Sequence, residues 1–328
     1  MPIGRQFLAL PVLAAAFIAA PPARADTYPT KSITIMPWLA AGTGLDVTVR
    51  LYAEQLSQTF GKPVVVENKP GSAGLVGVAA LKAAQPDGYT LAVATSAVMA
   101  IRPTLLKSPP YDAQKDFIPI ALYVKSPFIL VVDPKLPVNS VPELIQYVKE
   151  RPGKLSYSSS GVGGAPHLSA EYMKQRFGID LAHVPYRNSP QSIAEVAAGH
   201  VAMAFAEAGA SLPLIRQGKL RALAVSSATR LSTVPELPPF GEAVGAPDFE
   251  TVSWHVLLAP SGTPAAAVNR LHGEMKRIMQ LPEMIQKISA IGLIPQPVPS
   301  IEEQRQYITA EGAKWSALVK SLGLQGSQ

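Results

Sequence analysis

Short apolar runs alternate along the chain with longer segments whose apolar residues recur every three or four positions. The runs predict strands at 33–36, 64–66, 91–94, 129–132, 201–205, 222–225 and 253–258. The longer segments predict helices, and the first has Leu45, Val49, Tyr52 and Leu56 on one face. Strands that alternate with helices in this way are typical of α/β folds with parallel sheets.

Proline, glycine and small polar residues mark the predicted ends of these helices. Proline at the first helical position loses no hydrogen bond, so helices are predicted to begin near Pro166, Pro190 and Pro264. We expect N-caps at Ser189 and Thr263, and a capping box formed by Ser300 and Glu303. Glycines that suit a helix end follow at Gly178, Gly199 and Gly323.

Two long extended stretches, 118–132 and 253–260, suggest that the chain crosses into a second domain and returns. Two crossings leave a cleft between two lobes, with the ends of strands from both lobes facing it. The predicted organisation places a first lobe at 26–125 and 257–328 and a second lobe at 126–256. No internal repeat or low-complexity linker interrupts this layout.

Residues 1–25 have the features of a cleaved signal peptide. Arg5 supplies a positive start, residues 7–20 are apolar but short for a membrane span, and Ala23-Arg24-Ala25 fits a cleavage site. A retained anchor helix is the alternative. No later stretch has the roughly 18 continuous apolar residues of a span. We therefore expect an exported protein that is found in the periplasm and is soluble there.

Composition excludes several classes of protein. The 328 residues contain no Cys, which removes disulfide scaffolds, thiolate metal sites and cysteine nucleophiles. With 48% hydrophobic and 16% charged residues, the chain can bury a large core. The net charge of +6 falls by two when Arg5 and Arg24 are removed with the first 25 residues. No basic block interleaved with aromatics is present, so we expect no nucleic-acid partner.

The sequence has no complete catalytic motif. It lacks a nucleophile elbow, a phosphate-binding loop, a dinucleotide fingerprint and a zinc-binding helix motif, so neither a catalytic residue, a metal site nor a cofactor is predicted. The five histidines have no metal-ligand spacing. His167 stands apart, because it is expected in the first turn of a helix that follows a glycine-rich loop.

Four loops rich in Gly, Ser and Thr are expected directly after strands and before helices. They are 40–46, 95–97, 158–166 and 186–190. At such junctions the free N–H groups of a helix start and the positive end of its dipole can bind an anion. Any one of these loops can be an ordinary turn. Four together favour a site that binds a carboxylate through neutral donors.

Several segments resemble the periplasmic receptors of tripartite tricarboxylate transporters, also called Bug receptors. They are 64–71 (VVVENKPG), 86–91 (PDGYTL), 183–186 (HVPY), 218–225 (GKLRALAV) and 258–264 (LAPSGTP). The similarity extends from Tyr28 to the closing helix around Trp315. It implies a type II periplasmic-binding-protein fold, in which two α/β lobes joined by crossover strands hold a ligand in the cleft between them.

The resemblance also implies which residues contact the ligand. Family members bind small carboxylates through amides, hydroxyls and ordered water of the cleft loops. The positions that correspond here are Ala41, Gly42, Thr43, Gly44, Asp46, Ser96, Ser159, Ser160, Gly161, Gly163, His167, Tyr186 and Asn188. Asp46 has a second interpretation, as a residue that caps the following helix.

The sequence departs from the family pattern at two places. The first loop is one residue longer than is usual and places Leu45 before the acid, which changes its expected geometry. Where many relatives have an Asp that suits an amino-acid ligand, this chain has Ala206 followed by Glu207. An amino-acid ligand is therefore disfavoured unless Glu207 takes that role. Trp38 is expected either over an apolar ligand body or in the core.

We expect a receptor, not an enzyme, that captures a mono- or dicarboxylate and delivers it to permease subunits of a tripartite tricarboxylate transporter. It is expected to act as a monomer whose lobes close around the ligand like a flytrap. One alternative is a ligand-sensing subunit for a membrane kinase. Another is a cleft hydrolase or isomerase that uses His167 with Asp46 or Glu207 as acid and base.

Overall fold

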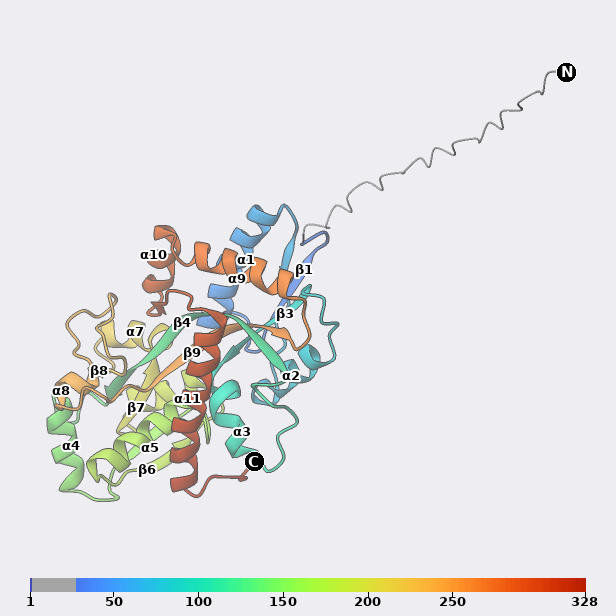
Figure 1. Ribbon diagram of the computed structural model, residues 1–328. Coiled ribbons are helices and arrows are strands. Elements are labelled where there is room, and N and C mark those ends of the chain that lie inside the picture. The colour runs from blue at the N-terminus through green and yellow to red at the C-terminus, as the bar shows by residue number, and fades with distance from the viewer. Residues whose placement is uncertain (2–27) are drawn as a thin grey trace.

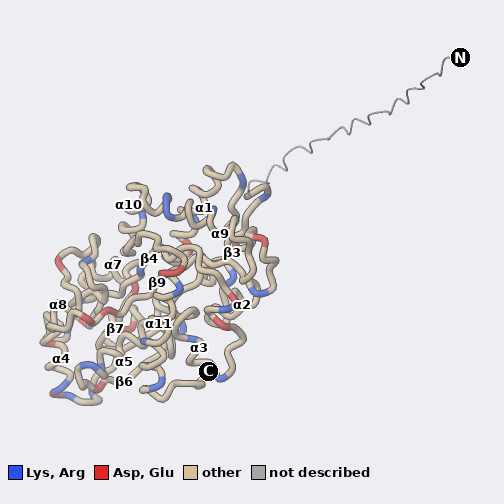
Figure 2. The backbone as a smooth tube through the Cα atoms, in the orientation of Figure 1, with Lys and Arg blue, Asp and Glu red and all other residues tan. Residues whose placement is uncertain are grey.

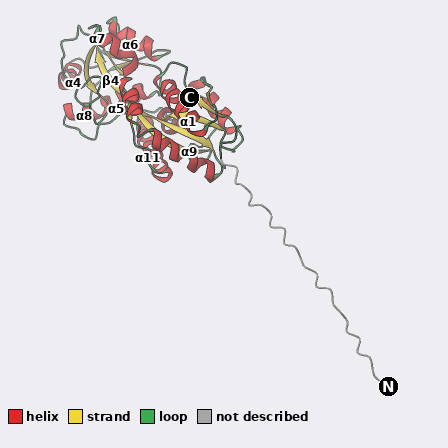
Figure 3. Ribbon diagram, turned by 90° about the horizontal axis from the view of Figure 1, so that it is seen from above, coloured by secondary structure: helices red, strands yellow, loops and turns green. Residues whose placement is uncertain are grey.

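The computed structural model describes residue 1 and residues 28–328. The predicted signal peptide, residues 1–25, lies outside the described residues except for Met1. Seen from above, the described chain forms two groups of strands and helices placed side by side (Figure 3). This two-lobed α/β architecture confirms the predicted fold class.

The first lobe contains a sheet in the order β2-β1-β3-β9-β4. Its strands are β1 (Ile33–Pro37), β2 (Val64–Val66), β3 (Thr90–Thr95), β9 (Val252–Pro260) and the first part of β4 (Phe117–Val132). The strands β1, β2 and β3 are parallel, whereas β9 runs antiparallel to both β3 and β4. The short β10 (Ile294–Pro295) pairs with β4.

The second lobe is built on the remaining part of β4. From Phe128 onward, β4 pairs antiparallel with β7 (Met203–Glu207) and β8 (Arg221–Val225). Two parallel strands, β5 (Ser156–Ser159) and β6 (Ala182–Pro185), extend this sheet beyond β7. One 16-residue strand therefore belongs to both sheets. The sheets contain both parallel and antiparallel pairs, whereas the sequence predicted parallel sheets.

Helices cover both sheets (Figure 1). Those of the first lobe are α1 (Gly44–Phe60), α2 (Leu75–Lys82), α3 (Arg102–Leu105), α9 (Ala265–Ile278) and α10 (Pro282–Ala290), with short turns at Ser72–Gly74 (η1) and Ala97–Ile101 (η2). Those of the second lobe are α4 (Val141–Lys149), α5 (Ala165–Phe177), α6 (Ser189–Ala197), α7 (Ala208–Arg216) and α8 (Phe240–Ala243). The last helix, α11 (Ile301–Ser321), runs across the front of both lobes. Among the described residues, no helix is long and apolar enough to cross a membrane.

The strands predicted from hydrophobic runs are present with shifted ends, but three were missed: β5, β6 and the two-residue β10. The strand β5 reads Ser-Tyr-Ser-Ser, so no apolar run marks it. Ser158 and Ser159 therefore lie inside a strand and not in the third loop. The strand β6 is an edge strand with two exposed residues, and its sequence is equally poor in apolar residues.

The predicted helix boundaries are confirmed in part. The capping box of Ser300 and Glu303 is present at the start of α11, and Gly178 ends α5 in the left-handed conformation. Asn188, not Ser189, caps α6, because its side chain accepts the N–H of Gln191 at 2.9 Å. Thr263 does not cap α9 either, because its hydroxyl donates to the Pro260 carbonyl.

Ser226 joins the two segments that cross between the lobes. Its hydroxyl accepts the N–H of Phe128 on β4 at 2.9 Å and donates to the carbonyl of Thr251, just before β9, at 2.6 Å. Its backbone bonds to the same two residues. Ser226 is fully buried. One residue therefore fixes the spacing of β4 and β9 where the chain leaves one sheet for the other.

Replacing Ser226 with Ala should lower the free energy of unfolding by about 1–3 kcal/mol, because it leaves the buried N–H of Phe128 without an acceptor. Urea denaturation checks this. Ser227→Ala is the control, because the Ser227 hydroxyl is also buried but makes only a local bond to the Thr229 carbonyl. Equal losses for the two variants would contradict a special role for Ser226.

Candidate functional site

A cavity of about 700 Å³ lies between the lobes, at the ends of strands from both sheets. The first lobe contributes the segment between β1 and α1 and the turn after β3. The second lobe contributes the glycine-rich loop before α5 and the start of α7. Between them, β4 and β9 supply Ser126, Phe128, Ser253 and His255. The cavity is therefore lined by both lobes and by the strands that connect them.

The first loop is held by Asp46, which does not line the cavity. The Asp46 carboxylate accepts the N–H of Gly42 at 2.9 Å and hydrogen bonds from Arg50 and Asn68. Burial opposes ionisation of Asp46, but the bonds from Arg50, Gly42 and Asn68 outweigh it and lower its pKa. Thr43 caps α1 by accepting the N–H of Asp46 at 3.4 Å. Thr43, and not Asp46, is therefore the N-cap, while Asp46 shapes the loop from behind.

The N–H groups of Gly44 and Leu45 belong to the first turn of α1, where no acceptor exists within the helix. Gly44 and Leu45 both line the cavity, together with Gly42 and Thr43. The Gly42 N–H is already taken by Asp46. The donors that remain for a ligand on this side are therefore at the start of the helix.

The third loop, residues 160–164, is supported from below by a stack of rings. The Gly163 N–H donates to Nδ1 of His167 at 3.2 Å, and the His167 and His183 rings lie 4.3 Å apart between centroids. Nε2 of His183 lies 2.7 Å from the Ser159 hydroxyl, which accepts the N–H of Gly161. His167 and Ser159 are buried and hold the loop, whereas Ser160, Gly161 and Gly163 line the cavity.

The His167 ring is kept neutral by its surroundings. Burial, and next the neighbouring His183, lower the pKa of His167 to about 4. Burial also lowers the pKa of His183. A neutral Nδ1 can accept the Gly163 N–H, and a protonated one cannot. The shape of the loop therefore depends on an uncharged His167.

The other predicted loop residues are also structural. Ser96 is buried and its hydroxyl lies 3.0 Å from that of Ser253, which does line the cavity. Asn188 caps α6, and the Tyr186 hydroxyl donates to Glu195 at 3.4 Å. Between them, Arg187 lines the cavity. The fourth loop thus reaches the cavity through Arg187, which was not among the predicted contacts.

Glu207 ends β7 and lines the cavity, while its neighbour Ala206 is buried against Ile129 of β4. The Glu207 side chain has accessible surface in the cavity, yet protein surrounds it on most sides. This desolvation raises the pKa of Glu207. Among the described residues, no cation or hydrogen-bond donor contacts its carboxylate. Glu207 is therefore an acid whose ionised form is disfavoured in the empty cavity.

Trp38 belongs to both the cavity wall and the core. Only 2% of its surface is exposed, and its ring meets Phe117 edge-on at 5.8 Å. A Cβ on Gly77 would lie 1.9 Å from Trp38 Cδ1, so the ring packs directly on the backbone of α2. Trp38 is therefore in the core, as one interpretation of the sequence expected, and it also lines the cavity. Trp38 is a rigid part of the wall.

In sum, half of the sequence-predicted contacts line the cavity: Trp38, Gly42, Thr43, Gly44, Ser160, Gly161, Gly163 and Glu207. The other half stand behind it or to its side: Ala41, Asp46, Ser96, Ser159, His167, Tyr186, Asn188 and Ala206. Sequence reasoning missed Arg102, Arg187, Ser126, Ser253 and His255. Arg187 lies between two chosen residues, but no motif singles out the other four.

His255 is the most deeply placed polar residue of the cavity. It is 4% exposed, its Nδ1 has no partner among the described residues, and burial lowers its pKa to about 4. It pairs across the sheet with Thr95 of β3 and Val124 of β4. The strands that connect the lobes therefore place a neutral imidazole at the cavity.

The arrangement can bind but offers no catalytic pair. The proposed acid and base were His167 with Asp46 or Glu207. His167 and Asp46 both lie outside the cavity lining and are occupied by structural bonds, so Glu207 lines the cavity without the proposed partner. Within the described part of the chain, no group of three or more His, Asp or Glu could hold a metal ion.

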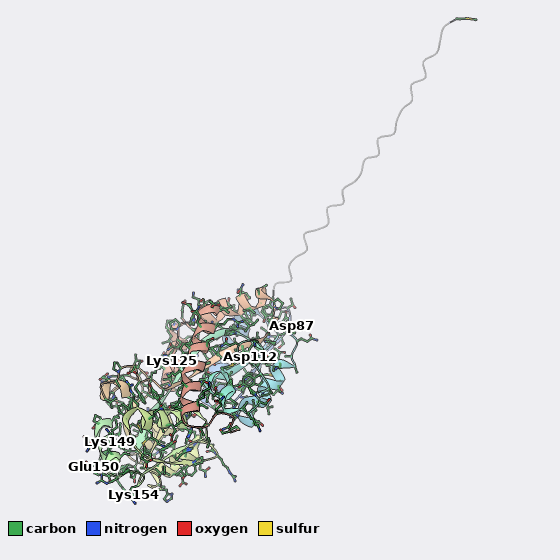
Figure 4. The ribbon with its side chains drawn as sticks, turned by 60° about the horizontal axis from the view of Figure 1, so that its bottom comes forward. Asp87, Asp112, Lys125, Lys149, Glu150 and Lys154 are labelled. Carbon is green, nitrogen blue, oxygen red and sulfur yellow. The ribbon has the colours of Figure 1, made fainter. Side chains whose placement is uncertain are left out.

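Lysines and arginines are spread over the surface of both lobes (Figure 2). Lys149, Glu150 and Lys154 lie at the far end of the second lobe, and Asp87 and Asp112 lie on the first (Figure 4).

Comparison with known proteins gives the family. The model of the tripartite tricarboxylate transporter family receptor (TctC) matches residues 48–324. The chain belongs to this family. It is 32% identical over 312 residues to Protein BugT of Bordetella pertussis, covering 95% of each chain. A protein encoded in the tcbD-tcbE intergenic region of Pseudomonas sp. strain P51 is 30% identical, covering 93% of this chain and 90% of that protein.

Solved structures agree with this assignment. Rpa4515 of R. palustris with adipate has a TM-score of 0.80 at 32% identity, covering 90% of this chain and 98% of that one. The periplasmic binding protein BugD has a TM-score of 0.76 at 30% identity, covering 91% and 99%. The TctC family consists of periplasmic solute-binding receptors and not of enzymes, which confirms the expectation that this chain is a receptor.

The stability of this TctC receptor should fall as the pH drops from about 6.5 to about 4. In this window the unfolded chain binds protons at His167, His183 and His255, and the folded protein, whose pKa values are lowered there, does not. The loss of stability is complete below the pKa values that these histidines have in the folded protein. Urea midpoints measured between pH 4 and pH 7.5 check the slope.

His167→Gln supplies a neutral acceptor for the Gly163 N–H and removes the titration. We expect the slope of its free energy of unfolding against pH to fall in this window by the amount that corresponds to about one proton. Substituting the exposed His200, which is bonded to Glu195 on the surface, is the control for the loss of a histidine outside the buried cluster. An unchanged slope in His167→Gln would contradict the buried neutral ring.

Proposed function

We propose that this protein is an exported receptor that captures a small organic carboxylate between its lobes and delivers it to the permease of a tripartite tricarboxylate transporter. In this proposal one lobe comprises residues 26–125 and 257–328, the other 126–256, and residues 1–25 direct export to the periplasm. The receptor acts as a monomer. Family membership and the composition of the cavity support the proposal.

The observation that carries it is the pair of helix starts that meet at one cavity from opposite lobes. The start of α1 offers the N–H groups of Gly44 and Leu45, and the loop before α5 offers Ser160, because the Gly161 N–H is already bonded to Ser159. A hydrogen bond to a charged group contributes about 1.5–3 kcal/mol, so several of them can offset the desolvation of a carboxylate. Glycines allow the ligand to approach the backbone.

The relatives support a carboxylate as the ligand. Rpa4515 was solved with adipate, and MatC of Rhodopseudomonas palustris with bound malate. The cavity walls here include Trp38, Phe128 and Leu293, which suit an apolar body between polar ends. We therefore propose an acid with a partly apolar carbon skeleton. Glu207 makes an amino acid the second candidate, because an ammonium group would stabilise its ionised form.

A sensing subunit for a membrane kinase would capture the same ligand, so the cavity does not separate it from a transport receptor. The hydrolase alternative is not favoured, because His167 and Asp46 lie outside the cavity lining and Glu207, which lines it, is left without either as a catalytic partner there. We retain transport as the function, since the matching family is defined by its transporters.

Binding is tested with the mature protein and a panel of acids, sugars and metal cations. Carboxylates should change the tryptophan fluorescence and raise the melting temperature, because ligand binds only the folded state. Small-angle scattering at saturating ligand should show a smaller radius of gyration. Binding of sugars or cations with no response to any carboxylate would contradict the proposal.

Closure depends on Gly163. Its φ is +77°, and a Cβ there would lie 2.3 Å from Leu105 Cδ1 of the other lobe. Gly163→Ala should therefore hold the lobes apart and weaken carboxylate binding by about tenfold, which corresponds to about 1.4 kcal/mol. Titration calorimetry measures the affinity.

Two further variants separate closure from general damage. Gly273→Ala in α9 adds a Cβ in open space and should leave the affinity unchanged. Adding Leu105→Ala to Gly163→Ala should restore part of the lost affinity, because it removes the clashing side chain. A double variant that binds no better than Gly163→Ala would show that contact between the lobes is not the cause.

A further inference from the structure

Two arginines line the cavity without any partner in the protein. Arg102 begins α3 in the first lobe, and Arg187 lies between β6 and α6 in the second. Neither side chain forms an ion pair or hydrogen bond with any residue that the structure describes. Most other arginines are engaged: Arg50 binds Asp46, for example, and Arg221 donates to two carbonyl groups. A free cation from each lobe thus faces the same space.

The charge of Arg102 is poorly compensated. Its side chain is partly buried, and this desolvation lowers its pKa, although the neighbouring Tyr111 acts in the opposite direction. A desolvated guanidinium without an anion is unfavourable, and an anion that enters the cavity would relieve it. The geometry of a guanidinium suits a carboxylate, which it can bind through two parallel hydrogen bonds.

Glu207 does not compensate these arginines, although it lines the same cavity. Burial alone accounts for its raised pKa, and no basic residue contributes to hold it ionised. An arginine close to Glu207 would act in the opposite direction. The positive charge of Arg102 and Arg187 therefore remains available to a ligand.

We infer that Arg102 and Arg187 bind a second anionic group of the ligand and so make the cavity select diacids over monoacids of the same size. The inference rests on the proposed function, in which the helix-start amides hold the first carboxylate. The two arginines belong to different lobes, so a second carboxylate that binds both would link the lobes and favour the closed form.

The test compares matched acids that differ by one charge: adipate with hexanoate, and phthalate with benzoate. Affinities of the mature protein are measured by calorimetry at low and high salt. The diacid of at least one pair should bind at least about tenfold more tightly than its monoacid. Its advantage should shrink at high salt, because screening weakens exposed charge interactions.

The variants are Arg102→Gln and Arg187→Gln. Each should weaken diacid binding by about tenfold and change monoacid binding less than about twofold. Arg216→Gln in α7 is the matched control, since Arg216 is exposed on the second lobe and does not line the cavity. Arg102→Lys and Arg187→Lys keep the charge and should retain part of the preference, even where a Gln variant folds poorly.

The outcomes distinguish the inference from the function on which it rests. If diacids and monoacids bind equally, or if the Gln variants weaken both by the same factor, the inference is wrong and the carboxylate receptor stands. If no acid of either pair nor of the wider panel binds, the proposed function fails and the inference fails with it.

Discussion

The cavity depends on one strand that belongs to two sheets. The strand β4 pairs with β9 as far as Pro127 and with β7 and β8 from Phe128 onward. Since backbone groups in a buried strand must be paired, the change of partners can occur only where another residue takes over the bonds. Ser226 does this, because its hydroxyl and backbone bond both Phe128 and Thr251. The polar residues Ser126, Ser253 and His255 reach the cavity at this point.

The residues around the cavity divide into those that face it and those that hold the loops in shape. A free helix-start N–H is useful to a ligand only if the loop before it is rigid. Asp46 and His167 supply this rigidity from behind, each by accepting one glycine N–H. In the first loop one N–H fixes the geometry, whereas in the third loop the N–H groups of Gly161, Gly163 and Gly164 are all bonded within the protein. The donors left in the first loop are therefore backbone groups, and the side chains behind both loops are mostly supports.

This division explains how far the sequence could predict the molecule. Apolar runs revealed the strands of the first lobe, since buried strands need them, and two crossing strands indicated two lobes. The polar strand β5 was not predicted, because its buried side chains form hydrogen bonds, such as that from the Ser158 hydroxyl to the Ser192 carbonyl, and need no apolar run. At the site, a motif marks a loop but not the direction of each side chain. Asp46 and His167 therefore look like contacts in sequence, and Arg102 and His255, which carry no motif, become visible only when the lobes are assembled.

The unpaired charged groups of the cavity indicate a site that a ligand occupies. A structural cation is usually paired within the protein, because leaving it desolvated and alone costs more than its contacts return. The side chains of Arg102, Arg187 and Glu207 and Nδ1 of His255 lack a partner among the described residues, whereas the supporting Asp46 accepts several hydrogen bonds. Arg102 and His255 are partly or fully buried, so leaving them unpaired lowers stability, and a ligand that contacts them on closing recovers that loss. A ligand that met only one lobe would leave half of these groups unpaired and would give the lobes no reason to close.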